Sequence, residues 1–210
     1  MDTLICSACI CPPVPFWGIL NTADNILIDQ FEYYRKRTNR NRYFITAPNG
    51  VQMLSIPLVK GKNESLPIRD VRIAYDESWI SRHIQAIRSS YGKSPYFEFY
   101  FDKWTEIFQR EHQFLLDLNI EMIEFFKSML KLDLNIEMTD KYYKKGVFIN
   151  DIRDKIWKAE PISASDAKFY TQVWEHRHGH YKNLSIIDLL FSSGPESKVL
   201  INNMAILNDC

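Results

Sequence analysis

The sequence predicts an α/β fold with mixed α+β character. We expect a central mixed β-sheet, formed by the N-terminal half with a parallel start and an antiparallel hairpin, packed by helices from the C-terminal half. Two apolar runs, 3–11 and 25–29, flank a short helix-compatible segment, as in a parallel strand–helix–strand unit. Two further strand-like runs bracket an Asn-Gly turn within residues 43–59. After residue 78 the apolar residues recur at helical spacing.

The chain of 210 residues is long enough to bury a sizeable core. We expect one domain over 1–210 that is β-rich over 1–76, mainly helical over 77–138 and mixed over 139–210. Its 26 basic residues equal its 26 acidic residues, so no global field attracts nucleic acid or an anionic membrane. Apolar runs fall short of the roughly 20 residues that span a bilayer, and the N-terminus lacks a basic leader region. We therefore expect a cytoplasmic protein without membrane insertion.

The first half supplies the predicted strands. The run 3–11 is expected to be a buried strand that stops at Pro12-Pro13, and Asn25–Asp29 is expected to be the second strand, ending in a carboxylate. Ligands of open α/β sheets bind at the carboxyl ends of the strands, which is where Asp29 would lie. Asn49-Gly50 predicts the hairpin turn, and the alternating run 68–75 predicts a third strand that extends the sheet in an antiparallel direction.

The second half supplies the predicted helices. We expect a helix from Ser78 that stops at Gly92, a long helix over 103–131, and a last helix over 199–207. The heptapeptide LDLNIEM occurs at 116–122 and at 132–138, and we predict a helix for the first copy and a strand for the second. Strands are also predicted within 146–151 and 169–174. Ser185 is predicted to cap a further helix, with Asp188 in its first turn.

A basic stretch precedes the hairpin and is the predicted anion-binding site. Five cationic side chains occur within eight residues: Arg35, Lys36, Arg37, Arg40 and Arg42. Guanidinium groups grip phosphate or carboxylate bidentately, and the interleaved asparagines add neutral donors. We therefore expect an activated donor to be bound by Asn39, Arg40, Asn41 and Arg42. The alternative is a solvated approach to the hairpin in which Arg42 bonds to a core carboxylate such as Asp29.

Asp29 and His83 are the predicted catalytic residues. Asp29 would act as a general base if burial raised its pKa, and His83, which borders the apolar face of its helix, would shuttle protons at the rim of a pocket. Each residue has a structural alternative, as an ion-pair partner or as a satisfied core histidine. A thiol nucleophile at Cys9 or Cys11, paired with His83, is a weaker hypothesis beside simple burial of these cysteines.

Two groups of potential metal ligands do not predict a metal site. Cys9 and Cys11 would point to one face of an extended strand and Cys6 to the other. His176, His178 and His180 would share a face in a strand, but their surroundings resemble a loop without an acidic or cysteine partner. We therefore expect neither a metal nor a bound cofactor.

The order of several short pieces resembles the WbqC-like protein family, in particular the branch common in bacteria of the Bacteroides type. The pieces are Pro12-Pro13 with Phe16-Trp17, Ala23-Asp24, Ile28-Asp29, Asn39-Arg40-Asn41-Arg42 with Gly50, Ser55-Ile56-Pro57, Trp79 with His83, Tyr91 to Phe97, and Gln172-Val173 followed by LSIIDLLFSSGPE at 184–196. Many members read His-Gln-Pro where this chain has Cys6-Ser7-Ala8, so no role of that histidine carries over. Gln172 is expected to contribute to substrate or anion binding.

The resemblance implies a role in a surface-polysaccharide or natural-product pathway. We expect a transferase that moves an acyl or aminoacyl group from a phosphate-containing donor (a carrier protein, coenzyme A or a nucleotide) to an amino sugar or similar amine. The alternatives are a non-catalytic scaffold that docks an acidic acyl-carrier protein, and a nucleotidyltransferase-like enzyme. An enzyme would show a concave pocket where Asp29, Arg42 and His83 converge, whereas a docking protein would show a flat basic face.

Overall fold

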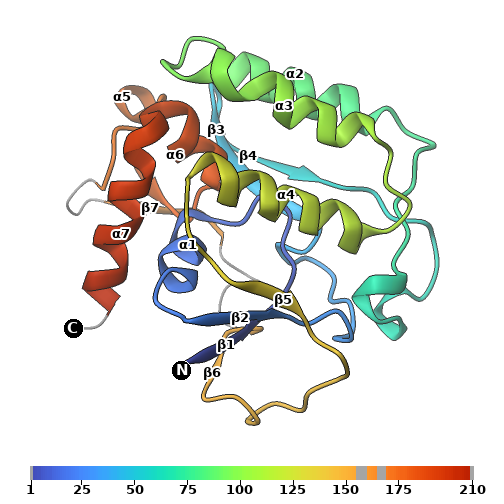
Figure 1. The fold of residues 1–210 in the computed structure, drawn as a ribbon. Helices are drawn as coiled ribbons and strands as arrows, with labels where there is room; N and C mark the ends of the chain where they lie inside the picture. Colours follow the sequence, from blue (N-terminus) through green and yellow to red (C-terminus); the bar gives the residue numbers. More distant parts are fainter. Residues whose placement is uncertain (1, 155–159, 165–168, 209–210) are drawn as a thin grey trace.

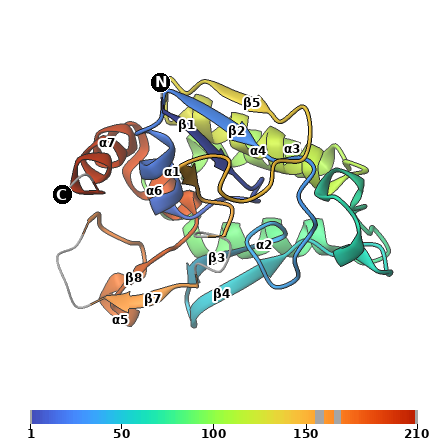
Figure 2. The ribbon, with the colours of Figure 1, turned by 90° about the horizontal axis from the view of Figure 1, so that it is seen from below.

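The computed structural model describes residues 2–154, 160–164 and 169–208, and it confirms the mixed α/β class. Its central sheet has the strand order β5-β2-β1-β6, and each neighbouring pair is parallel (Figures 1 and 2). The bounds are β1 (Thr3–Cys6), β2 (Asn25–Ile28), β5 (Ile136–Met138) and β6 (Asn150–Asp151). Both outer strands therefore come from the second half of the chain.

The parallel start takes the predicted form, but the first strand is shorter than expected. Helix α1 (Val14–Leu20) joins β1 to β2, and Pro15 lies in its first turn. The first turn of a helix tolerates proline, because the backbone N–H that proline lacks has no partner within the helix there. Residues 7–11 are buried outside the strand, where Ile10 N–H donates to the carbonyl of Asn39 and Cys11 has a φ of 42°. A run of buried apolar residues is compatible with a strand and equally with a buried loop. The predicted strand over 3–11 was therefore too long.

The Asn-Gly hairpin forms where the sequence predicts it. Strands β3 (Arg42–Ala47) and β4 (Gly50–Ser55) pair in an antiparallel direction, and Gly50 adopts a φ of 110° that favours glycine. They form a separate two-stranded sheet, so the expected antiparallel extension of the central sheet is wrong. The physical reason is that β5 and β6 occupy the positions outside β2 and β1.

The predicted strand over 68–75 is also wrong. This run forms the 3₁₀ turn η2 (Ile68–Asp70), preceded by η1 (Asn63–Ser65). The following residues make only isolated bridges, from Ile73 to Leu58 and from Arg72 to Phe114. These contacts bury Ile68, Val71 and Ile73, which explains the alternating pattern without a continuous strand.

The helical layer consists of α2 (Trp79–Tyr91), α3 (Phe97–Gln109) and α4 (Leu115–Met129). The single long helix predicted over 103–131 is wrong, because the chain turns after α3, where Glu111 has a φ of 51°. The first copy of the repeated heptapeptide lies in α4 and the second leads into β5, as predicted. Phe126 of α4 packs edge-on against Trp17 of α1, and both side chains are fully buried.

The C-terminal part covers the end of the molecule beside α1 (Figure 1). It contains β7 (Ile162–Ala164), α5 (Glu175–His178), β8 (His180–Lys182), α6 (Ile186–Ser193), η3 (Gly194–Glu196) and α7 (Ser197–Asn208). Ser185 caps α6, as predicted, by accepting a hydrogen bond from Ile187 N–H at 3.3 Å. The strand predicted over 169–174 is absent, and this run is irregular up to α5.

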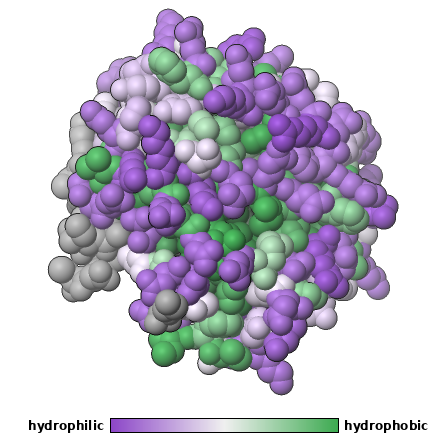
Figure 3. Space-filling model, viewed as in Figure 1, coloured by the Kyte–Doolittle hydropathy of each residue, from purple (hydrophilic) through white to green (hydrophobic). Residues whose placement is uncertain are grey.

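The surface is predominantly polar in the orientation of Figure 1, with hydrophobic residues scattered across its middle and lower parts (Figure 3). Among the described residues, no helix combines the length and apolar character that crossing a bilayer requires.

Candidate functional site

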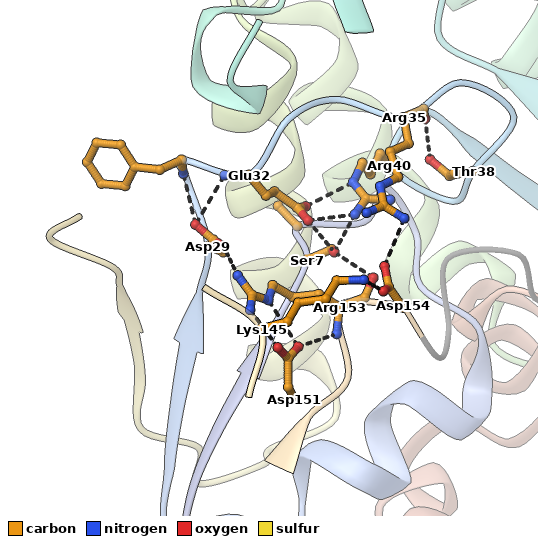
Figure 4. A network of polar contacts seen from close by, with 12 residues as sticks. Ser7, Asp29, Glu32, Arg35, Thr38, Arg40, Lys145, Asp151, Arg153 and Asp154 are labelled. Carbon is orange, nitrogen blue, oxygen red and sulfur yellow. Dashed lines mark hydrogen bonds and ion pairs between the residues drawn. The ribbon is translucent and has the colours of Figure 1, made fainter. Parts of the chain in front are cut away.

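Polar side chains follow three neighbouring strands at the carboxyl edge of the central sheet. Ser7 follows β1, Asp29 follows β2, and Arg153 follows β6 by two residues (Figure 4). Parallel strands bring their carboxyl ends to the same edge, where ligands of open α/β sheets bind. The sequence placed Asp29 at this edge correctly, and the structure adds the side chains that surround it.

Asp29 is fully buried, and both of its carboxylate oxygens are engaged. Oδ1 accepts hydrogen bonds from the N–H groups of Phe31 and Glu32, at 3.0 and 3.1 Å. Oδ2 accepts from Nη1 of Arg153 at 2.6 Å. These contacts make Asp29 a positioning residue that shapes the turn after β2 and holds Arg153. The partner proposed for Asp29 from the sequence, Arg42, is replaced by Arg153.

Arg40 forms an ion pair inside the protein. Its side chain is 0% exposed and binds Glu32 bidentately, with Nε to Oε1 at 2.9 Å and Nη2 to Oε2 at 2.6 Å. Nη2 also donates to the Ser7 hydroxyl oxygen at 2.7 Å. Nη1 is buried without a hydrogen-bond partner among the described residues. Arg40 therefore links the loop after β1 to the loop after β2.

Arg153 is the centre of a second ion-pair group. It binds Asp29, and it binds both oxygens of Asp151 through Nη2 at 2.5 Å and Nε at 3.0 Å. Burial opposes ionisation of Asp151, but the hydrogen bonds from Arg153 outweigh that effect and lower the pKa of Asp151. Sequence reasoning missed Arg153, although the predicted strand within 146–151 placed it just beyond a strand end.

A small hollow opens beside these ion pairs. Its volume is about 70 Å³, which suits a single phosphate-sized group, and it is lined by Glu32, Tyr33, Arg35, Tyr142, Lys145, Arg153 and Asp154. Arg35 Nη1 lies 3.0 Å from Asp154 Oδ1, and Lys145 pairs with the other oxygen of the same carboxylate. Two cations from distant segments therefore already converge on one anionic group.

Glu32 is a buried residue whose carboxyl group lines this hollow. Burial raises the pKa of Glu32 above its ordinary range, and the Arg40 guanidinium and Ser7 hydroxyl oppose this rise without cancelling it. A carboxyl with a raised pKa suits general acid–base chemistry near neutral pH. Glu32 was not among the predicted site residues, because nothing in its local sequence separates it from other acidic loop residues.

The predicted basic stretch divides into an exposed part and a buried part. Arg35, Lys36 and Arg37 are exposed, and the first two pair with Asp154 and Glu64. Asn39, Arg40 and Asn41 are buried. Asn41 accepts from the Tyr34 hydroxyl at 3.0 Å and donates to the Ile56 carbonyl at 2.9 Å, so it ties the stretch to the hairpin. Arg42 begins β3, and its Nε is buried without a hydrogen-bond partner in the part of the chain that is described.

His83 lies apart from Asp29, against the hairpin. Its Nδ1 is 2.9 Å from the Tyr43 hydroxyl and its Nε2 is 3.3 Å from the Ser55 carbonyl. The carbonyl can only accept, so Nε2 carries the proton and Nδ1 accepts from Tyr43. Burial lowers the pKa of His83 to about 4. His83 also lines a different hollow, with Trp79 and Arg82, so the structure does not bring Asp29, Arg42 and His83 together.

The cysteines lie in the core. Cys9 and Cys11 are each about 1% exposed, and burial raises the pKa of Cys9 to about 12 and that of Cys11 as well. A thiol that remains protonated is a poor nucleophile. This environment disfavours the hypothesis of a reactive thiolate paired with His83.

Alkylation tests whether the thiols of Cys9 and Cys11 are reactive in the folded protein. At pH 8 a thiol with a pKa near 12 is only about one part in ten thousand thiolate, so native protein should show no iodoacetamide adduct on Cys9 or Cys11 by peptide mass spectrometry. The same treatment in concentrated urea should label both residues. Rapid labelling of Cys9 in protein that remains folded would contradict the assignment.

The three C-terminal histidines do not share a strand face. His176 stacks against Trp174, His178 Nε2 lies 2.9 Å from the Pro48 carbonyl, and His180 lies in β8. Across the described ranges, no group of three or more histidine, cysteine or acidic side chains is placed to hold a metal ion. Gln172 is buried beside His180 rather than at the carboxyl edge of the sheet.

The comparison with protein families gives a match that covers most of the chain. The WbqC-like protein family matches residues 8–172, a range that includes Asp29, Glu32, Arg40 and Arg153. No curated protein and no solved structure matches the chain.

Proposed function

Because this chain belongs to the WbqC-like protein family, we propose that it is a transferase that moves an acyl or aminoacyl group from a phosphate-containing donor to an amino sugar or similar amine. The observation that carries the proposal is the hollow at the carboxyl edge of the sheet, where Glu32 lies beside Arg35 and Lys145. The proposal includes a cytoplasmic place in a surface-polysaccharide or related pathway.

In this proposal, the cationic side chains of the hollow bind the phosphate of the donor. In the proposed complex, a phosphate of the donor takes the position of the Asp154 carboxylate between Arg35 and Lys145. Tyr33 and Tyr142 line the same hollow and are 57% and 52% exposed, so their rings offer flat surfaces for a nucleobase or a sugar. The hollow is too small for a whole nucleotide, so the rest of the donor lies outside it.

In this proposal, Glu32 is the general base that accepts the proton of the attacking amine. The amine nitrogen attacks the acyl carbon, the bond from that carbon to the donor's oxygen or sulfur breaks, and the Glu32 carboxylate accepts the proton that the amine loses. Its raised pKa brings the carboxylate closer in basicity to the working pH. Asp29 and Arg40 act in this scheme as positioning residues, because their contacts hold the loop that carries Glu32.

The charged side chains give less support to the alternative function, a non-catalytic scaffold that docks an acidic carrier protein. A protein that binds an acidic carrier needs an exposed, uncompensated basic face. Here the exposed Arg35 and Lys36 each pair with a carboxylate, as does the buried Arg40. A concave and charge-balanced site fits a small ligand better than it fits a docking surface.

Calorimetric titration with coenzyme A, acetyl coenzyme A and nucleotide sugars tests the proposal. We expect at least one of these donors to bind, and the Arg35→Gln and Lys145→Gln variants each to weaken it about tenfold through the lost charge-assisted hydrogen bonds. Arg82→Gln is the matched control, because Arg82 is an exposed arginine that pairs with Glu77 and lines the other hollow. The proposal fails if no donor binds, or if both variants bind it as the control does.

A further inference from the structure

A groove runs along the outer edge of the hairpin, between strand β4 and helix α2. It consists of two hollows, of about 560 and 340 Å³, which share Gln52 and Met53. Strand β4 lines both hollows, and α2 adds Ser89 to the larger one and Trp79 and His83 to the smaller one. In Figure 2, β4 lies outside β3 at the margin of the molecule. No described residue lines both this groove and the hollow at the carboxyl edge.

The hydrogen bonds of β3 show which backbone groups of β4 point away from the hairpin. The carbonyl of Phe44 accepts from the N–H of Ser185, and the N–H of Thr46 donates to a tyrosine hydroxyl, so both residues direct these groups away from β4. In an antiparallel pair, the residue opposite such a residue also directs its N–H and C=O outward. The residues opposite Phe44 and Thr46 are Met53 and Val51. Their backbone groups therefore face the outer side of the hairpin.

This edge of β4 is free to pair with another strand. Across the described ranges, neither the N–H nor the C=O of Val51 or Met53 has a hydrogen-bond partner, whereas the carbonyl of Ser55 is already bound by Nε2 of His83 at 3.3 Å. Natural edge strands are usually protected by a charge, a proline or a bulge. Residues 50–55 contain no charged residue and no proline, and their pairing with β3 is continuous. Outward N–H and C=O groups at alternate residues are recognised by another extended backbone.

The size of the edge disfavours a second copy of this chain as its partner. Strand β4 has six residues, which extend about 20 Å. Two copies joined along this edge alone would bury far less than the roughly 1,200 Å² of a stable interface. A single peptide also fits the space between β4 and α2, so it contacts the helix as well as the strand. The groove therefore favours an extended peptide over self-pairing.

The walls of the groove select an uncharged peptide. Among the described residues of the lining, Arg82 is the only one with a formal charge, and its Nη2 already binds Glu77 at 2.6 Å. Burial lowers the pKa of His83 to about 4, so its ring is neutral at pH 7. Val51 and Met53 are 39% and 46% exposed, so they present apolar surface. These walls complement a peptide that has apolar side chains and no charge.

We propose that this groove binds an extended, uncharged peptide segment of another protein, which adds a strand to the free edge of β4. The peptide exchanges backbone hydrogen bonds with Val51 and Met53, and its apolar side chains pack against the same two residues. The inference concerns a second site and does not depend on the proposed transferase activity.

NMR titration of the whole chain with two blocked pentapeptides tests the inference. The peptide acetyl-Ser-Val-Thr-Val-Ser-amide is uncharged and favours the extended conformation. It should give saturable shifts of the amide signals of Val51 and Met53 and slow the exchange of these amides with deuterium. The acidic peptide acetyl-Ser-Glu-Thr-Glu-Ser-amide should bind at least tenfold more weakly, because the groove offers no free cation.

Two N-methylated forms of the uncharged peptide test recognition of the backbone. Methyl groups on its first, third and fifth residues remove one alternating set of N–H donors, and methyl groups on its second and fourth residues remove the other set. One set faces β4 and the other faces away from it. One form should therefore lose affinity at least tenfold, and the other should bind as the parent peptide does.

Two variants locate the binding on β4. Val51→Lys adds a charge to the edge, and Met53→Pro removes an N–H that takes no part in pairing with β3, so each should weaken binding about tenfold. Val199→Lys makes the same change as the first variant at an exposed position of α7 outside the groove, and should bind as the wild type does.

Three results would overturn the inference. The first is the absence of saturable shifts with the uncharged peptide, or equal binding of both N-methylated forms and the parent. The second is wild-type affinity in folded Val51→Lys and Met53→Pro proteins. The third is a dimer in light scattering that Val51→Lys converts to a monomer, because a second copy would then occupy the edge.

Discussion

Replacing Arg40 with alanine should destabilise the protein by about 3–5 kcal/mol, because it leaves a buried carboxylate without its partner. The Arg40 side chain is 0% exposed and binds Glu32 and Ser7 at 2.6 to 2.9 Å. Without the guanidinium, Glu32 must either remain charged in a buried site or become protonated. Urea unfolding followed by circular dichroism measures the change in the free energy of unfolding.

Two further variants separate this ion pair from the basic stretch in general. Arg35→Ala removes a cation five residues away, but the Arg35 side chain is 45% exposed, so the cost should stay below about 1 kcal/mol. The double variant Arg40→Met with Glu32→Met removes both buried charges and should lose less stability than Arg40→Ala alone. An Arg40→Ala protein as stable as Arg35→Ala would show that the pair is not a structural element.

Lowering the pH should destabilise the protein through His83 by about 3 kcal/mol. The pKa of His83 is lowered to about 4 in the folded state, from an ordinary value of 6.5. The unfolded chain therefore binds more protons in this interval, and each pH unit between the two values corresponds to about 1.4 kcal/mol. The stability that neutral His83 contributes is complete above pH 6.5 and is lost as the pH falls through about 4.

His83→Gln is the test variant for this pH dependence. It should be less stable at pH 7, because the hydrogen bond to Tyr43 is altered, but its free energy of unfolding should fall less steeply between pH 6.5 and 4. His176→Gln, at an exposed position, is the control and should keep the slope of the wild type. If the free energy of unfolding of His83→Gln fell as steeply with decreasing pH as that of His176→Gln, burial would not hold His83 neutral.

Elements whose signals are local were predictable. The Asn49-Gly50 turn requires φ values that glycine tolerates, and the hairpin forms around it. The helical spacing after Ser78 and the capping residue Ser185 likewise mark α2 and α6 within two residues. Two of the failures share a cause: in residues 7–11 and 68–75 the apolar pattern reflects burial, and a buried loop and a buried strand give the same pattern.

The candidate site was predictable only in part. A carboxylate at a strand end and a cationic stretch placed Asp29 and Arg40 near one edge of the sheet. Nothing local could reveal that Arg153, 124 residues away, is the partner of Asp29, or that Glu32 is the partner of Arg40. The pairing of Asp29 with Arg153 depends on β6 lying beside β1, a long-range contact between halves of the chain. The pairing of Glu32 with Arg40 joins residues only eight positions apart, but it depends on the fold of the loop between them.

By itself, the sequence determined the class of fold, the family, the hairpin, and the strand-end position of Asp29, because each depends on the residues in one short segment or on their order along the chain. The tertiary structure alone decided which cations of the basic stretch are buried, that His83 lies apart from Asp29, and that a groove forms between β4 and α2. Burial and ion pairing are properties of neighbours in space, and those neighbours come from segments that the chain order keeps far apart.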